Sequence, residues 1–143
     1  MLLEHDFPPD LRVENEISSL LESGHEIHVA CVTKSGKESE RLSEHYFIHR
    51  KGISSFIYKS SIAALKLPFY FNFWRNYLNT IINEFDFDAV HIHDLPLGII
   101  GKELKERYGL KFTMDLHESW PAYLKNAHHT NTLTGKLLSS NRQ

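Results

Sequence analysis

Short runs of apolar residues, many of them β-branched, recur along this chain and predict the strands of a β-sheet. The clearest run is Glu26 to Val32, whose inner residues are almost all apolar, as in a parallel strand covered on both faces. Further strands are predicted at residues 1–3, 46–48, 88–93 and 111–116. Residues 33–43 are polar and include a glycine, so they are predicted to form a loop.

Between these runs, apolar residues recur at helical spacing and predict three helices. The first helix can be capped by Asp10 and ended by Gly24, and it carries the stripe Val13, Ile17, Leu20 and Leu21. The second follows Pro68 and carries the stripe Tyr70, Trp74, Tyr77, Ile81 and Phe85. The third carries Leu97, Ile100, Leu104 and Tyr108.

The predicted order of elements is β-α-β-(β)-α-β-α-β, which is typical of an α/β domain with a mainly parallel sheet. Right-handed crossovers would place helices on both faces of that sheet. The sequence therefore predicts a Rossmann-like three-layer α/β/α fold, with one domain covering residues 1–143. No internal repeat or linker interrupts it.

The amino-acid composition excludes several functional classes for this protein. The 143 residues include 16 basic and 18 acidic side chains, which argues against a general nucleic-acid binder. A single cysteine, Cys31, excludes an internal disulfide and a cysteine-rich zinc site. Neither a signal peptide nor a membrane-spanning apolar run is visible. We expect a cytoplasmic protein, with at most a surface attachment to the inner face of a membrane.

Candidate chemistry gathers where predicted strands end, and in open α/β sheets ligands bind beyond the carboxyl ends of the strands. Four segments leave such ends, and three of them contain both histidine and an acidic residue: 5–10, 93–96 and 115–118. His117 is the strongest candidate, because a histidine at a strand exit can donate a hydrogen bond or move a proton near neutral pH. His91, in contrast, is interpreted as a core residue of a buried strand.

Other kinds of site find less support. A metal site made of His93, Asp94, His117 and Glu118 is conceivable, but no His-Glu-x-x-His framework supports it, and no metal is predicted. Phosphate-binding and dinucleotide-binding glycine motifs are absent, as is a Gly-x-Ser-x-Gly nucleophile turn. The aromatic run at residues 69–77 is interpreted as a helix covered by core or by a partner. Its alternative is an apolar acceptor groove or membrane contact, helped by nearby cations: Lys59, Lys66 and Arg75.

Three sequence blocks, the first made of two segments, resemble the amino-terminal domain of family 4 glycosyltransferases, which have the GT-B fold. Residues 6–16 (DFPPDLRVENE) and 20–29 (LLESGHEIHV) are similar to the start of that family. Residues 87–94 (FDAVHIHD) and 115–121 (DLHESWP) resemble its later strand and strand-exit motifs, in family order. The likeness covers most of the chain up to about residue 124.

This resemblance implies one half of a two-domain enzyme that moves a sugar from a nucleotide-sugar to a glycan or lipid-linked acceptor, with retention of configuration. The amino-terminal domain would bind the acceptor, and no cofactor or metal would be needed beyond the nucleotide-sugar co-substrate. By position, His117 matches the histidine that approaches the donor sugar. Substrate binding would involve Asp10, Arg12, Asp94 and Glu118.

The sequence also departs from the family pattern. The first loop lacks a Gly-Gly pair, and the motifs of the nucleotide-sugar-binding carboxyl-terminal domain are absent from these 143 residues. We therefore expect the chain to need such a domain as a partner, to be inactive alone, and to expose apolar surface that could support a dimer. Two other classes stay open. One is a non-catalytic Rossmann-like module that binds a ligand or partner, and the other is a metal-dependent hydrolase.

Overall fold

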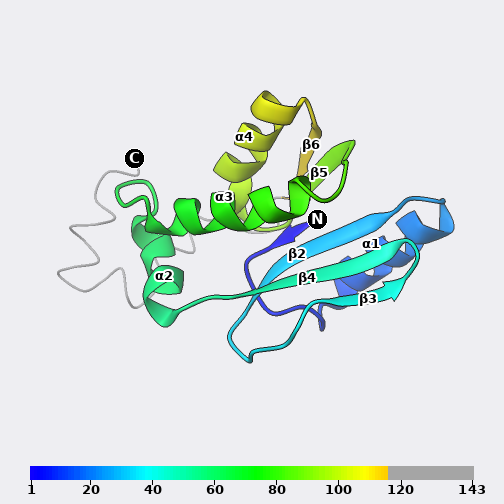
Figure 1. Ribbon diagram of the computed structural model, residues 1–143, viewed down its shortest axis with the longest axis horizontal. Helices are drawn as coiled ribbons and strands as arrows, with labels where there is room; N and C mark the ends of the chain where they lie inside the picture. The colour runs from blue at the N-terminus through cyan, green and yellow to red at the C-terminus, as the bar shows by residue number, and fades with distance from the viewer. Residues whose placement is uncertain (116–143) are drawn as a thin grey trace.

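The computed structural model describes residues 1–115, and these form a six-stranded sheet with helices on both faces (Figure 1). The spatial order of the strands is β3-β4-β2-β1-β5-β6. Only β3 runs antiparallel to its neighbour, β4. The strand bounds are β1 Leu2–Leu3, β2 Ile27–Thr33, β3 Glu40–Ser43, β4 Tyr46–Gly52, β5 Ala89–Ile92 and β6 Lys111–Met114.

Four α-helices connect and cover these strands: α1 Leu11–Glu22, α2 Ser55–Lys59, α3 Phe69–Ile82 and α4 Gly98–Tyr108. Short 3₁₀ turns at Ser60–Ala63 and Leu95–Leu97 precede α3 and α4. Helix α1 covers one face of the sheet, and α3 and α4 cover the other. The predicted α/β/α layering and mainly parallel sheet are therefore confirmed.

Alternating side chains of the central strands divide the core into two parts. Leu3 and Cys31 point toward α1, where they pack with Val13 and Ile17 of that helix. Leu2 and Ala30 point to the opposite face, into the larger core beneath α3 and α4. This alternation follows from the two-residue period of a strand and explains why β2 is buried along its whole length.

Two sequence-based predictions fail in detail. The polar segment 33–43 was predicted to be loop, yet residues 40–43 form β3. All four β3 side chains are exposed, so this edge strand is held by backbone pairing with β4 and carries no apolar pattern. In the second helix, the predicted stripe ends with Phe85, but α3 stops at Ile82 and Phe85 instead packs edge-on against the His28 ring.

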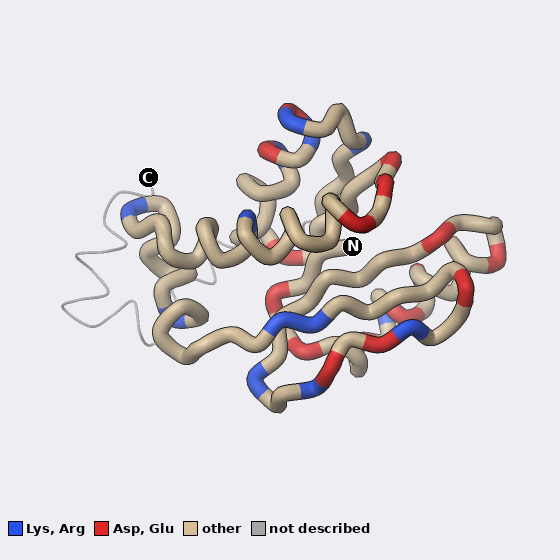
Figure 2. Tube along the Cα trace, in the orientation of Figure 1, with Lys and Arg blue, Asp and Glu red and all other residues tan. Residues whose placement is uncertain are grey.

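Acidic and basic residues are interspersed along the described chain, most visibly along β3 and the loop before it (Figure 2). Within residues 1–115, no helix is both long and apolar enough to cross a membrane.

Candidate functional site

The short central strand β1 brings two strand-exit loops together at the carboxyl edge of the sheet. Because β1 pairs with β5 in parallel, the chain leaves both strands at the same edge, with Glu4 following β1 and Asp94 following β5. The backbone N–H of Glu4 donates to Oδ2 of Asp94 at 2.7 Å, although the two residues are 90 positions apart in the sequence. This contact fixes Asp94 against the start of the first loop.

Asp10 holds the far end of that loop by capping α1. Its Oδ1 accepts hydrogen bonds from the backbone N–H groups of Arg12 and Val13 at 3.2 and 3.3 Å. In return, the backbone N–H of Asp10 donates to a carboxylate oxygen of Glu14 at 2.8 Å. Such reciprocal capping satisfies amide groups that a helix N-terminus otherwise leaves unpaired.

His5 links the two predicted carboxylates across the loop. Its Nδ1 lies 3.7 Å from Oδ2 of Asp94, and its Nε2 lies 3.5 Å from Oδ2 of Asp10. The Arg12 guanidinium lies 3.8 Å from the same Asp10 oxygen. The structure therefore brings three predicted site residues, Asp10, Arg12 and Asp94, into one polar chain. The other two, His117 and Glu118, lie outside the described residues.

Glu4 adjoins this polar chain, and the sequence did not single it out as a candidate. Burial, with the nearby charge of Asp94 adding to it, raises the pKa of Glu4 to about 7. The Tyr70 hydroxyl of α3 donates to Oε2 of Glu4 at 2.9 Å, which favours the ionised form and offsets part of that rise. Burial also raises the pKa of Asp94. Carboxyl groups with raised pKa values at a strand edge are typical of functional sites.

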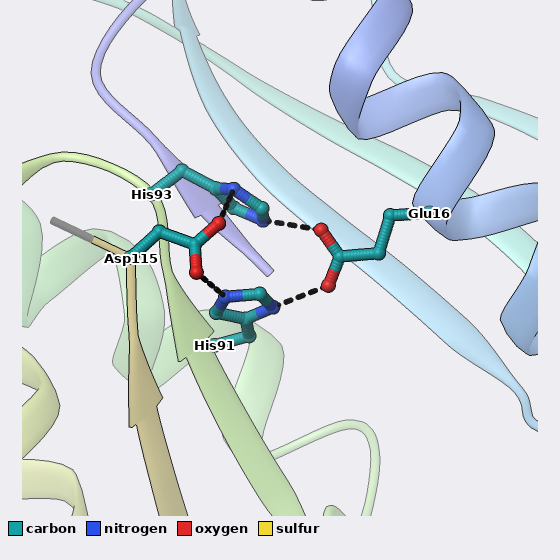
Figure 3. A group of neighbouring side chains, drawn as sticks. All are labelled: Glu16, His91, His93 and Asp115. Carbon is teal, nitrogen blue, oxygen red and sulfur yellow. Dashed lines mark ion pairs between the residues drawn. The ribbon is translucent and has the colours of Figure 1, made fainter. Parts of the chain in front are cut away.

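A second cluster lies beside this edge, on the α1 side of the sheet (Figure 3). His91 and His93 project from one face of the β5 segment toward Glu16 of α1 and toward Asp115, which follows β6. His91 Nδ1 lies 2.7 Å from Glu16 Oε1, and His91 Nε2 lies 3.3 Å from Asp115 Oδ1. His91, interpreted from the sequence as a core residue, is half-buried in the structure and lies between two carboxylates.

His93 is the most deeply buried member of this second cluster, and its side chain has no exposed surface. Burial, together with the neighbouring His91, lowers the pKa of His93 to about 4. The ring is therefore neutral at pH 7. Its two nitrogens face Glu16 at 3.9 Å and Asp115 at 3.5 Å, distances too long for hydrogen bonds.

A third polar group lies at the opposite, amino-terminal edge of the strands. His28 accepts or donates on both sides, with Nε2 2.9 Å from Glu26 Oε1 and Nδ1 2.9 Å from His49 Nε2. Burial, with His28 beside it, lowers the pKa of His49 to about 4. A cavity of about 340 Å³ borders this group and the starts of β2 and β5. The described site candidates at the strand exits, Asp10, Arg12 and Asp94, are not among the residues that line this cavity.

Comparison with protein families identifies the class of protein to which this chain belongs. The model of Glycosyltransferase Family 4 matches residues 12–140 of the chain. No match was found among curated proteins or among solved structures. The matched segment covers most of the 143 residues, so this chain belongs to Glycosyltransferase Family 4. The resemblance seen in the sequence blocks is confirmed, and with it a general glycosyltransferase function.

Proposed function

We propose that this chain is the acceptor-side domain of a retaining glycosyltransferase. In this proposal it works with a carboxyl-terminal domain that binds the nucleotide-sugar, and the sugar is transferred to a glycan or lipid-linked acceptor. The observation that carries the proposal is the family match over residues 12–140, joined to the convergence of polar side chains at the carboxyl edge of β1 and β5. That edge is where open α/β sheets bind their ligands.

The described part of the site supports a role in substrate binding. Asp94 and Asp10 present carboxylate oxygens at the sheet edge, and such oxygens accept hydrogen bonds from sugar hydroxyls. Arg12 lies on the first turn of α1, where the helix dipole and its guanidinium both favour a negatively charged group. By its place in the matched motif, His117 is proposed to orient or polarise groups at the transferring sugar, with Glu118 binding hydroxyls.

An exposed apolar surface near the start of α3 supports a lipid-linked acceptor. Phe56 and Phe69 are 67% and 46% exposed, and their rings pack together with centroids 5.7 Å apart. Leu65 is 63% exposed and is followed in the sequence by Lys66, and Lys59 is the last residue of α2. Apolar side chains among lysines favour contact with the surface of an anionic membrane.

The direct test joins this domain to the carboxyl-terminal domain of a family 4 enzyme whose donor is known. We expect the joined protein to release nucleoside diphosphate from that donor, which the separate halves should do poorly. His117→Ala should then lower kcat by at least about 100-fold, the scale of losing one polarising group at a reacting centre. His45→Ala is the matched control, because the His45 side chain is 68% exposed and lies in the β3–β4 turn.

Two results would count against the proposal. Unchanged turnover in the His117→Ala protein would remove the role assigned to His117. Failure of every joined protein to consume a nucleotide-sugar, while the domain is folded by circular dichroism, would favour the non-catalytic ligand- or partner-binding module instead.

A further inference from the structure

The second polar cluster has the chemical composition and the shape of a cation site. Its four side chains come from three separate elements, namely α1 (Glu16), the β5 segment (His91 and His93) and the exit of β6 (Asp115). One nitrogen or oxygen from each side chain can be chosen so that all four atoms lie within 4.8 Å of one another. Figure 3 shows the two imidazole rings and the two carboxylates facing one another as a closed ring.

The histidines in this ring lack the partners that buried polar atoms normally have. Neither ring nitrogen of His93 makes a hydrogen bond within the described structure, although the side chain is fully buried. Nε2 of His91 is also without a hydrogen bond there. Buried polar atoms in folded proteins are nearly always hydrogen-bonded, so three such nitrogens beside two carboxylates call for an additional ligand.

We propose that Glu16, His91, His93 and Asp115 together bind one divalent transition-metal ion, for which zinc is the best match. Imidazole nitrogens select zinc and its neighbours in the first transition series, whereas calcium and magnesium require oxygen ligands almost alone. Two nitrogens and two carboxylate oxygens also complete a four-coordinate zinc site.

The spacing of the side chains fits this coordination. Zinc bonds of about 2.0–2.2 Å in a tetrahedral arrangement set neighbouring ligand atoms roughly 3.4 Å apart. In the structure the two nitrogens of each imidazole face different carboxylates, at 2.7 to 3.9 Å, whereas one ligand atom chosen from each of the four side chains gives a set within 4.8 Å. Rotation of the side chains would bring these four atoms to the shorter spacing that a bound zinc ion requires.

A metal held this way would fasten the first helix to the sheet. The ion would connect α1 with β5 and with the end of β6, which are far apart in the sequence and are brought together by the fold. Four protein ligands leave no open position for substrate, so the role is structural and is independent of the proposed sugar transfer. Glu16 and Asp115 have side chains 31% and 30% exposed, which gives the ion a path of entry.

The test is metal binding by the full chain after removal of metal with a chelator. Zinc is titrated in competition with a coloured chelator, and Co²⁺ is used as an optical probe of four-coordinate geometry. We expect one ion per chain, intense visible Co²⁺ bands, and no displacement by Ca²⁺ or Mg²⁺. Glu16→Gln and His93→Gln should each weaken zinc binding by at least about 10-fold. His45→Gln, which removes an exposed histidine elsewhere, should bind zinc like the parent protein.

Two outcomes would overturn the proposal. One is the absence of stoichiometric zinc binding by the parent chain. The other is equal zinc affinity in the parent and the Glu16→Gln variant, which would place the ion on surface histidines. Glu16 is partly exposed, so this variant remains decisive if His93→Gln fails to fold. Thermal unfolding adds a second measurement, since zinc should raise Tm of the parent and of His45→Gln but not of Glu16→Gln.

Discussion

Replacing Glu4 by glutamine should change how the stability of the domain depends on pH. Glutamine keeps the size of the side chain and resembles the protonated acid, but it cannot ionise. In the folded protein, burial and then the nearby Asp94 raise the pKa of Glu4 from 4.5 to about 7. The folded state therefore holds this proton more tightly than the unfolded chain does. The stabilisation is complete below pH 4.5 and is lost as pH rises through 7.

The size of the effect follows from the two pKa values of Glu4. A carboxyl group with pKa 4.5 when unfolded and about 7 when folded loses about 2.5 kcal/mol of folding free energy between pH 5 and pH 8. Buried histidines act in the opposite direction. The pKa of His49, for example, is lowered to about 4 by burial, so its contribution is present above pH 6.5 and is lost on acidification. The contribution of Glu4 is therefore obtained from the difference in unfolding free energy between the parent protein and the Glu4→Gln variant, in which the contributions of the histidines cancel.

The measurement is urea unfolding of the parent and of Glu4→Gln at pH 5, 6, 7 and 8. We expect the glutamine variant to gain about 2.5 kcal/mol relative to the parent across this range. Glu44→Gln, which removes an exposed carboxylate in the β3–β4 turn, should show no such gain. A free-energy difference between Glu4→Gln and the parent that stays constant with pH would refute the reasoning, because it would mean that Glu4 ionises equally in both states.

Two further predictions concern packing and the apolar surface. Gly101→Ala should lower the free energy of unfolding by about 1–3 kcal/mol, because a Cβ there would lie 2.4 Å from the Phe112 ring. At Gly98, in the same helix, an added Cβ would contact only the flexible end of the Met114 side chain. Gly98→Ala should therefore lower the free energy of unfolding less than Gly101→Ala does, as measured by chemical denaturation. The double change Phe56→Ser and Phe69→Ser should reduce co-sedimentation with anionic lipid vesicles; unchanged sedimentation, or loss of a dimer instead, would contradict the membrane assignment.

The layered fold could be predicted from the sequence because its strands differ sharply from their surroundings. Residues 27–33 are buried without exception, and of the predicted helical stripe Val13 and Ile17 are buried in α1 while Leu20 and Leu21 are half-buried. The edge strand β3 escaped prediction for the opposite reason. Its side chains, such as Glu40 and Arg41, are exposed, and it is held by backbone pairing with β4 and by polar contacts such as the ion pair between Glu40 and Arg50, which leave no periodic apolar signal.

The candidate site was only partly predictable because its contacts join distant segments. Position at a strand exit singled out the segments that contain Asp94 and Asp10, and in the structure His5 lies between the carboxylates of these two residues. Nothing local in the sequence marks Glu4, whose raised pKa depends on burial and on a residue 90 positions away. Glu16 was equally hidden, because it occupies a polar helix position that is typical of a solvated face.

The segment around β5 contributes neighbouring residues to two separate polar clusters. Successive side chains of a strand point to opposite sides, so His91 and His93 share one side and face Glu16. Asp94 follows immediately but lies at the sheet edge, where it accepts the Glu4 amide. Under the two proposals above, changes at Asp94 should affect substrate binding, and changes at His93 should affect metal binding and stability. The effects of substitutions at these two adjacent residues can thus be distinguished by experiment, because His93 and Asp94 contact different groups.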